Sequence, residues 1–261
     1  MRTSAFKSAP TDIKRLFVII PAAGIGSRMS SPENKQFLEI AGSSVIERTL
    51  KAFDEFSNRL NRRGSFSLQV IVVAHEEQIF KVKGLCDKNR FQFVKSIVPG
   101  GDTRQDSVWN GIVAMSSLPF PPNEDDVVFI HDGARCMIDQ DTLDRCLKAA
   151  SNFDVCAPAV PVKGTIKQTE GPDSNQVATT PDRATLQEIQ TPQVFRYSVL
   201  VEAYTAAMRR GRTATDDTSL AEAMGHRVHL IEGSYSNIKI TTPEDLHFAE
   251  SLIKAKQDEK T

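Results

Sequence analysis

The sequence predicts an α/β fold in which helices flank a mostly parallel sheet, and two observations support this prediction. Short apolar segments rich in Val and Ile alternate with amphipathic segments of roughly ten to fifteen residues, the pattern of consecutive βαβ units. Polar clusters follow several of the apolar segments, at the sheet edge where ligands bind in such folds. The chain has 261 residues, 40% of them hydrophobic, which is enough to bury one α/β core.

The first expected strand covers residues 16–20, which are all apolar, as in a strand buried on both faces. It leads into residues 21–26 (PAAGIG), a loop with little side-chain bulk whose backbone N–H groups can approach an anion closely. Arg28 and Lys35 then add positive charge. Met29 replaces the third glycine of a dinucleotide fingerprint, and no P-loop spacing is present. The segment indicates a nucleoside triphosphate site, with an ordinary tight strand–helix turn as the alternative.

The remaining elements follow in order along the chain. Helices are expected at residues 43–56, 76–85, 103–115, 141–150 and 197–208, in a short segment up to residue 224, and from residue 242 onward. Strands are expected at residues 69–73, 93–98, 126–130, 155–160, 228–231 and 237–240, with an extended segment at 191–195 and a polar turn at 58–67. The last helix begins with a capping Thr242 and with Pro243 at its first position.

Residues 163–184 interrupt this alternation and indicate a hairpin arm. The segment is polar and has a strong turn signal at residues 171–175 (GPDSN), flanked by short β-forming pieces at 165–167 and 176–179. Because an isolated two-stranded hairpin is marginally stable in water, we expect the arm to pack against another surface. A second subunit is the expected partner.

Composition argues against several classes of function. The net charge of −1 argues against bulk nucleic-acid binding, and no apolar segment approaches the roughly 18 residues of a membrane span. Residues 1–15 lack the apolar core of a secretory signal, so we expect a flexible tail there, one domain at 16–255 and a short tail at 256–261. The four cysteines form no C-x-x-C pair, which argues against structural zinc and fits a cytoplasmic protein with reduced thiols.

Three polar clusters should converge on one site, because the carboxyl ends of parallel strands meet at one edge of a sheet. They cover residues 21–26, 99–107 and 131–135. Within the last cluster, His131 is expected to hold the strand end rather than to act as an acid. Asp132 follows the same strand, and a lone Asp at a strand end is often only a helix or turn cap. Residues 216–217 are assigned to the start of a helix and not to catalysis.

The order of these motifs resembles the 2-C-methyl-D-erythritol 4-phosphate cytidylyltransferases, the IspD family. The matching segments are PAAGIGSRM…KQFL, GGDTRQDSV, IHDGAR, TPQ, TDD and NIKITTPEDL. The resemblance implies a Rossmann-like fold of the nucleotide-diphospho-sugar transferase type and a homodimer whose arms clasp each other. It also implies transfer of CMP from CTP to 2-C-methyl-D-erythritol 4-phosphate, with Mg²⁺ and release of pyrophosphate, in non-mevalonate isoprenoid biosynthesis.

The resemblance also implies roles for individual residues. CTP would be held by Ala22, Ala23, Gly24, Gly26, Gly101, Asp102, Ser107, Asp132 and Gly133. Charge on the reacting phosphates would be stabilised by Arg28, Lys35, Arg183 and Lys239. The sugar phosphate would contact Arg135, Thr165, Thr191 and Thr215. Asp132 would also lie at the Mg²⁺, and the arm residues Thr165 and Arg183 would enter the site of the partner subunit.

Three positions depart from the usual family pattern. Gly133 stands where Ala is frequent, Cys136 replaces a Pro, and Gly164 replaces a frequent Asp. Cys136 and Gly164 fall on the expected acceptor side, which leaves another polyol phosphate, such as ribitol 5-phosphate, as an alternative acceptor. The further alternatives are a transferase that uses UTP or GTP, and a nucleotide-binding module without catalysis.

Overall fold

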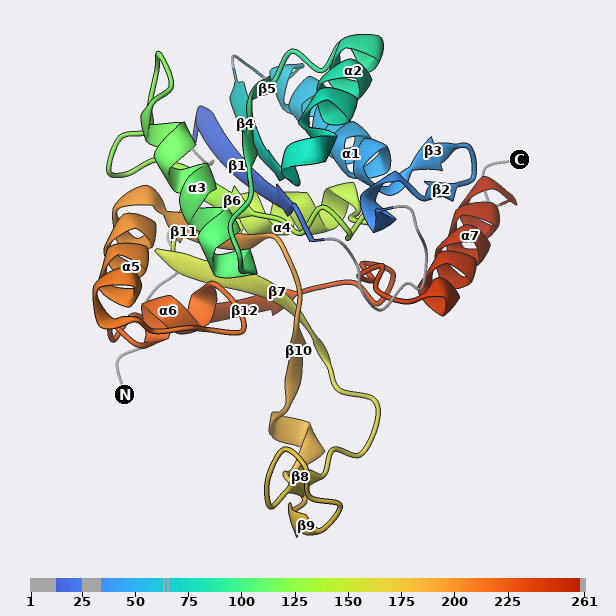
Figure 1. Cartoon of the computed structure of the whole chain (residues 1–261), viewed down its shortest axis with the longest axis vertical. Coiled ribbons are helices and arrows are strands. Elements are labelled where there is room, and N and C mark those ends of the chain that lie inside the picture. Colours follow the sequence, from blue (N-terminus) through green and yellow to red (C-terminus); the bar gives the residue numbers. More distant parts are fainter. Residues whose placement is uncertain (1–12, 25–33, 63, 65, 259–261) are drawn as a thin grey trace.

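The computed structural model describes residues 13–24, 34–62, 64 and 66–258, and its centre is a mixed sheet of eight strands (Figure 1). The strands lie in the order β10-β7-β11-β6-β1-β4-β5, and β12 also pairs with β7. Their bounds are β1 Arg15–Ala22, β4 Ser67–Ala74, β5 Val94–Pro99, β6 Val127–Ile130, β7 Val155–Pro161, β10 Gln187–Ile189, β11 Gln193–Arg196 and β12 His229–Glu232. Two smaller pairs are β2 Glu39–Ile40 with β3 Ser43–Ser44, and β8 Gln168–Thr169 with β9 Val177–Thr179.

The sheet is parallel around β1 and mixed at its other end. β1 pairs in parallel with β4 and with β6, and β5 extends this half by parallel pairing with β4. In the other half, β11 runs antiparallel between β6 and β7, and β10 runs antiparallel to β7. The predicted α/β class with a mostly parallel sheet is confirmed.

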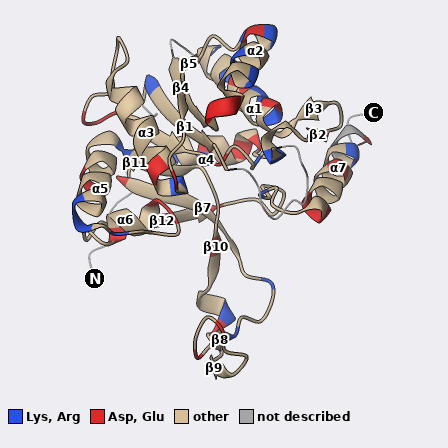
Figure 2. Ribbon diagram, in the orientation of Figure 1, with Lys and Arg blue, Asp and Glu red and all other residues tan. Residues whose placement is uncertain are grey.

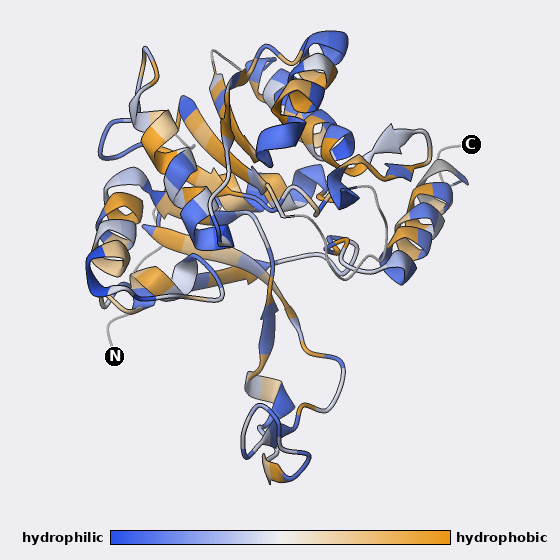
Figure 3. Ribbon diagram, in the orientation of Figure 1, coloured by the Kyte–Doolittle hydropathy of each residue, from blue (hydrophilic) through white to orange (hydrophobic). Residues whose placement is uncertain are grey.

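Helices cover both faces of the sheet. The α-helices of the described residues are α1 Val45–Asn61, α2 Ile79–Asn89, α3 Arg104–Ser116, α4 Gln140–Ala150, α5 Tyr197–Arg210, α6 Thr218–Glu222 and α7 Pro243–Asp258. Side chains alternate along β1: Leu16, Val18 and Ile20 pack with α1, α2 and α4. Phe17 and Ile19 pack with α3, α5 and α6 on the opposite face. Figure 3 shows the corresponding apolar colour on the strands and on one side of several helices.

Helix α1 is longer than the sequence predicted. It begins after the N-cap Ser44, close to the expected start, but it continues through residues 58–61, which we expected to form a turn. Leu60 packs against the core, and Arg59 forms an ion pair with Asp144 of α4. These tertiary contacts hold the polar last turn in a helical conformation.

Residues 237–240 are all described, and they do not form the strand that we expected there. Their backbone groups are held one at a time instead. The carbonyl oxygen of Asn237 accepts a hydrogen bond from Arg135 Nη1 at 2.7 Å, and the N–H of Ile240 donates to the carbonyl of Ala134 at 2.8 Å. Because these partners are a side chain and a loop, no ladder of hydrogen bonds forms.

The arm projects from the sheet, as its polar composition suggested (Figure 1). β8 and β9 form an antiparallel pair on either side of the turn at 171–175, but the expected strand piece at 165–167 is not a strand. A strand at 165–167 would have to pair with residues that include Pro181, and proline has no N–H to donate to a neighbouring strand. The sequence analysis did not foresee β10, which pairs with β7 and anchors the returning chain.

Figure 2 shows basic and acidic residues interspersed over the helices. In the described part of the chain, no helix combines the length and the apolar character needed to cross a bilayer. The four cysteines are free and buried.

Candidate active site

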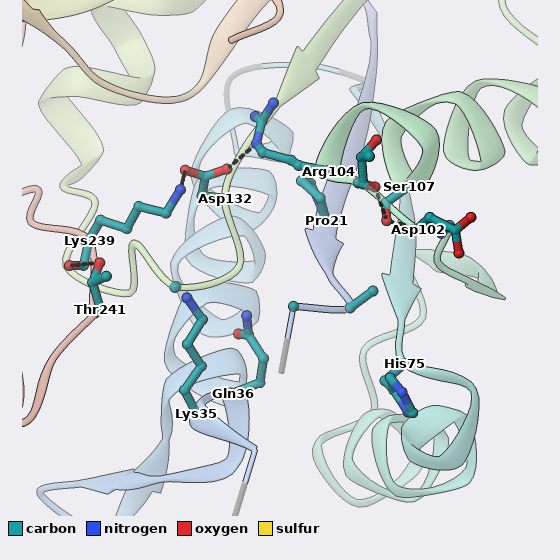
Figure 4. A pocket seen from close by; sticks show the side chains of 15 residues that line it. Pro21, Lys35, Gln36, His75, Asp102, Arg104, Ser107, Asp132, Lys239 and Thr241 are labelled. Atoms are coloured by element: carbon teal, nitrogen blue, oxygen red, sulfur yellow. Dashed lines mark hydrogen bonds and ion pairs between the residues drawn. The ribbon is translucent and has the colours of Figure 1, made fainter. Parts of the chain in front are cut away.

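A cavity of about 590 Å³ lies at the carboxyl ends of the parallel strands (Figure 4). It brings together residues from three expected clusters and from the segment before α7. The predicted site residues that line it are Ala23, Gly24, Lys35, Gly101, Asp102, Ser107, Asp132 and Lys239. Gln36 and His75 also line it, and the sequence analysis gave neither a role. The size is within the usual range for a small-molecule site.

The loops after β1 and β5 approach each other too closely for side chains on both. A Cβ added at Gly100 would lie 2.3 Å from the Cβ of Ala23, and one added at Gly101 would lie 2.4 Å from the Cβ of Asp106. Ser107 Oγ accepts a hydrogen bond from the N–H of Gly101 at 3.1 Å and thereby ties this loop to α3. The glycines therefore let two backbones form one narrow wall of the cavity.

Asp132, on the opposite wall, contacts three cationic side chains. Its Oδ1 accepts a hydrogen bond from Arg104 Nε at 2.9 Å, and its Oδ2 lies 2.7 Å from Lys239 Nζ and 3.8 Å from Arg135 Nε. Burial acts to raise the pKa of this carboxyl, but Arg104, Lys239 and Arg135 outweigh burial and hold the pKa well below its usual value. Asp132 is therefore ionised at neutral pH and fixes the ammonium of Lys239 at the cavity.

Lys35 reaches the same region from a different element. It begins the short 3-10 helix η2 Lys35–Phe37, which Asn34 caps through a hydrogen bond from the N–H of Gln36. Lys35 Nζ donates to the carbonyl oxygen of Ile240 at 3.4 Å. In Figure 4, Lys35 and Lys239 both point toward the side of the cavity that holds Asp132.

Sequence reasoning missed the role of Arg104. This side chain lines the cavity and joins Asp132 to Asp217, whose oxygens accept hydrogen bonds from Arg104 Nη1 and Nη2 at 2.8 Å each. The hydroxyl of Tyr204 donates to Asp217 Oδ1 at 2.5 Å. Its position in the sequence could have indicated this role, because Arg104 lies in the first turn of α3, three residues before the predicted site residue Ser107.

The TPQ and TDD motifs interact through Gln193. Its Oε1 accepts hydrogen bonds from the N–H groups of Asp217 and Thr218, and its Nε2 donates to Asp216 Oδ2 at 2.9 Å. These contacts bring two short motifs that lie apart in the sequence into one hydrogen-bond network. They also set the position from which Asp217 reaches Arg104.

The sequence comparisons decide the family. A model of the IspD family, described as 2-C-methyl-D-erythritol 4-phosphate cytidylyltransferase, matches residues 16–255. The chain belongs to the IspD family. The enzyme of that name from Alkaliphilus oremlandii is 40% identical over 247 residues, which cover 95% of this chain and 98% of the relative. The enzyme of the same name from Geobacillus kaustophilus is 39% identical over 241 residues, which cover 92% of this chain and 98% of the relative.

Solved structures agree with this IspD assignment. The 2-C-methyl-D-erythritol 4-phosphate cytidylyltransferase from Thermus thermophilus is 31% identical with a TM-score of 0.66, covering 91% of this chain and 98% of that one. The 4-diphosphocytidyl-2C-methyl-D-erythritol synthase from Anaerococcus prevotii is 28% identical with a TM-score of 0.74, and the match covers 92% of this chain and 99% of that one. The resemblance that the motifs indicated is confirmed.

Two residues with roles suggested by the IspD motifs lie behind the cavity wall. Arg135 and Thr191 are 8% and 3% exposed, and neither is among the described residues that line the cavity. Burial lowers the pKa of Arg135, while Asp132 opposes this change. Thr191 Oγ1 accepts a hydrogen bond from the N–H of Asp132 at 3.1 Å. In this structure both residues support Asp132, and their contact with the sugar phosphate stays a prediction.

Of the remaining predicted site residues, those that the structure describes are not among the residues that line the cavity. Gly26 and Arg28 fall outside the described residues. Thr165 and Arg183 are exposed on the arm, where Arg183 Nη1 donates to the carbonyl oxygen of Lys163 at 2.9 Å. Thr215 is exposed in the loop before α6.

Ala22 and Gly133 pack together, and neither is among the described residues that line the cavity. A Cβ on Gly133 would lie 3.0 Å from the Cβ of Ala22. Of the other two departures from the IspD pattern, Cys136 is buried in an apolar cluster with Ile40 and Ile240. Gly164 has open space around it.

A resident metal has little protein coordination available. Among the described residues, no group of three His, Cys, Asp or Glu side chains could hold a metal ion. Both oxygens of Asp132 already contact cations, although each keeps a second lone pair. Mg²⁺ commonly takes one or two carboxylates and completes its coordination with phosphate oxygens and water. The residues therefore fit a metal that arrives with a nucleotide, to which Asp132 can contribute one oxygen.

Proposed function

We propose that this chain transfers CMP from CTP to 2-C-methyl-D-erythritol 4-phosphate, with release of pyrophosphate, as a step of non-mevalonate isoprenoid precursor biosynthesis. The observation that supports this best is the placement of Lys35 and Lys239 from distant parts of the chain beside the bare Ala23-Gly24 loop in one cavity. The proposal also agrees with the names of its relatives.

Repulsion between anions is the main barrier to this reaction. The attacking group is a phosphate monoester with a second pKa near 6, so it is largely ionised at neutral pH and needs no general base. We assign Lys35 and Lys239 to stabilise the negative charge that builds up around the α-phosphate, and Arg28 to the same task. Mg²⁺, when bound with CTP, would supply positive charge at the leaving pyrophosphate.

The cytidine is assigned to the wall formed by residues 100–107. Here Gly101, Asp102 and Ser107 line the cavity, and Figure 4 shows Asp102 and Ser107 on the side away from Asp132. Close-packed backbone can place hydrogen-bond acceptors at the amino group of cytosine. A site built this way rejects a base that lacks the amino group more strongly than an apolar pocket could.

The arm residues require a second subunit if they act on substrate. Arg183 and Thr165 are exposed on a hairpin that extends away from the body of the chain (Figure 1). The apolar side chains Ile166 and Val177 on this hairpin are 43% and 52% exposed. We therefore propose a homodimer in which each arm packs on the partner and contributes Arg183 and Thr165 to its site. A cytoplasmic location is proposed as well, in keeping with four free cysteines.

Pyrophosphate release by the purified chain tests the proposal. CTP and Mg²⁺ would be supplied with 2-C-methyl-D-erythritol 4-phosphate or ribitol 5-phosphate in parallel, and with UTP and GTP in place of CTP. Turnover with CTP and the methylerythritol phosphate alone is the expected result. Preference for ribitol 5-phosphate would reassign the acceptor, and binding of CTP without turnover with any acceptor would contradict the proposed activity.

A further inference from the structure

Asp217 ends a series of ion pairs that begins at the cavity. Both of its oxygens accept hydrogen bonds from Arg104, through Nη1 and Nη2 at 2.8 Å each. Asp217 Oδ1 also accepts a hydrogen bond from the hydroxyl of Tyr204 at 2.5 Å. Asp217 is 1% exposed and Tyr204 is fully buried. This two-point contact fixes the plane of the guanidinium as well as its position.

Asp217 and its partner Tyr204 are held in turn by two further elements. Gln193, in β11, accepts a hydrogen bond from the N–H of Asp217 at 2.8 Å, which fixes the backbone of this residue. The ring of Tyr204, in α5, stacks on Trp109 of α3 with the ring centres 6.4 Å apart. Elements on three sides therefore determine where the carboxylate of Asp217 lies.

The cavity end of this series determines the position of Lys239. With Nη1 and Nη2 held by Asp217, Arg104 directs Nε to Asp132 Oδ1 at 2.9 Å. This leaves Asp132 Oδ2 for Lys239 Nζ at 2.7 Å. Arg104 thus shares its charge between two carboxylates. Without Asp217, Arg104 would be drawn further onto Asp132 and would compete with Lys239 for it.

We propose that Asp217 is a positioning residue for nucleotidyl transfer. Together with Tyr204 it orients Arg104, so that Arg104 and Lys239 divide the two oxygens of Asp132 and the ammonium of Lys239 is held at the reacting phosphates. This inference rests on the proposed function for the role of Lys239. It assigns Asp217 no contact with substrate, since this residue does not line the cavity formed by the described residues.

Kinetics of Asp217→Asn and Tyr204→Phe test the proposal. A misplaced catalytic group costs up to about 10²-fold in rate, so we expect Asp217→Asn to lower kcat about 10- to 100-fold while the KM for CTP changes less than about threefold. Tyr204→Phe keeps the ring and removes one hydrogen bond, so its kcat should fall about threefold and the variant covers the case in which Asp217→Asn does not fold. Asp144→Asn removes the same charge from the ion pair with Arg59, between α1 and α4, and is the matched control. Unchanged kcat in both test variants would overturn the proposal.

A double variant separates positioning from a general structural defect. If Asp217 acts through Lys239, Asp217→Asn should lower kcat by less than about twofold when Lys239→Ala is already present. A structural defect would multiply the two losses. Full multiplication of the losses would therefore contradict the proposed route.

NMR reports on the same arrangement without turnover. The Nε–Hε resonance of Arg104, assigned by its loss in Arg104→Lys, should shift and exchange faster with water in Asp217→Asn but not in Asp144→Asn. An unchanged resonance would overturn the positioning role, whatever reaction the enzyme catalyses. If the resonance moves but the wild-type chain shows no turnover with any acceptor, the arrangement stands and the proposed function fails.

Discussion

Nδ1 of His131 lies 3.1 Å from Oγ1 of Thr191, directly behind Asp132. On the other side of the ring, Nε2 lies 3.1 Å from the carbonyl oxygen of Arg135, which can only accept a hydrogen bond. The neutral ring therefore carries its proton on Nε2, and Nδ1 accepts a hydrogen bond from the Thr191 hydroxyl. Thr191 Oγ1 in turn accepts one from the N–H of Asp132. His131 thus holds the strand end, and both of its nitrogens are engaged in doing so.

The burial of His131 predicts a loss of stability in mild acid. Burial lowers its pKa to about 4, from an ordinary value of 6.5, although Asp132 opposes this change. As the pH falls through this window the unfolded state binds a proton that the folded state does not, so the free energy of unfolding decreases. Between pH 7 and pH 4.5 this residue should account for about 2–3 kcal/mol. Urea denaturation at both pH values should show that the free energy of unfolding decreases less in His131→Gln than in the wild-type protein. An equal decrease in the two proteins would contradict the prediction.

Lys35→Ala should lower the rate of pyrophosphate release strongly. Loss of one preorganised charge at a reacting centre costs about 10²–10³ in kcat, and we expect the same range for Lys239→Ala and Arg28→Ala. Lys51→Ala is a suitable control, because this exposed lysine forms an ion pair with Glu47 on α1 and does not line the cavity. A loss of less than about tenfold would remove the residue concerned from the catalytic list.

Gly133→Ala should destabilise the fold by about 1 kcal/mol. The added Cβ would lie 3.0 Å from the Cβ of Ala22 and 3.1 Å from Gln36 Oε1. The Ala22 atom is fixed to the backbone of β1 and cannot rotate away, so the strand end must shift. Gly164→Ala, which meets open space, is the control. Thermal unfolding tests this prediction. Equal midpoint temperatures for the two variants would contradict it, because they would mean that Ala22 and Gln36 can move without destabilising the fold.

Mixed subunits test whether the arm acts on the partner. Arg183→Ala and Lys35→Ala proteins are each expected to be nearly inactive. If Arg183 acts in the partner's site, equal mixing should restore about a quarter of wild-type activity, because half of the dimers are mixed and half of their sites are intact. Subunit exchange would be followed with differently tagged chains. Confirmed exchange without recovery would contradict the swapped arrangement.

The sequence predicted the sheet edge well because strand ends carry local signals. Apolar runs followed by small or polar residues marked β1, β5 and β6, and the loops after these strands do line one cavity. Helix starts also depend on residues close together in the sequence. Thr103 caps α3, and its side chain and that of Asp106 form a capping box. The errors occurred where distant contacts override local preference. The last turn of α1 is held by α4, and residues 237–240 are held by Arg135 and a loop.

Arg104 and Asp217 could not be assigned from sequence for a similar reason. They lie 113 positions apart, and their contact depends on how α3, α5 and β11 pack. An aspartate before a short helix is most often a cap, so Asp217 carried no signal of its own. Its role becomes visible only when its side chain is seen to face a guanidinium rather than the N-terminus of α6.

The reversed direction of β11 limits how its connections can change in length. A strand antiparallel to its neighbours brings its first residues to the edge where those neighbours end. Gln193 of β11 pairs with Ile130 of β6, so the same register carried two residues further sets Thr191 opposite Asp132. Removing one residue between β10 and β11 would turn each following side chain of β11 to the other face or pull Thr191 away from Asp132. The turn at residues 171–175 connects β8 to β9 on the arm, where an added residue leaves the register of β11 unchanged. Insertions should therefore accumulate there, while the three residues joining β10 to β11 keep their number.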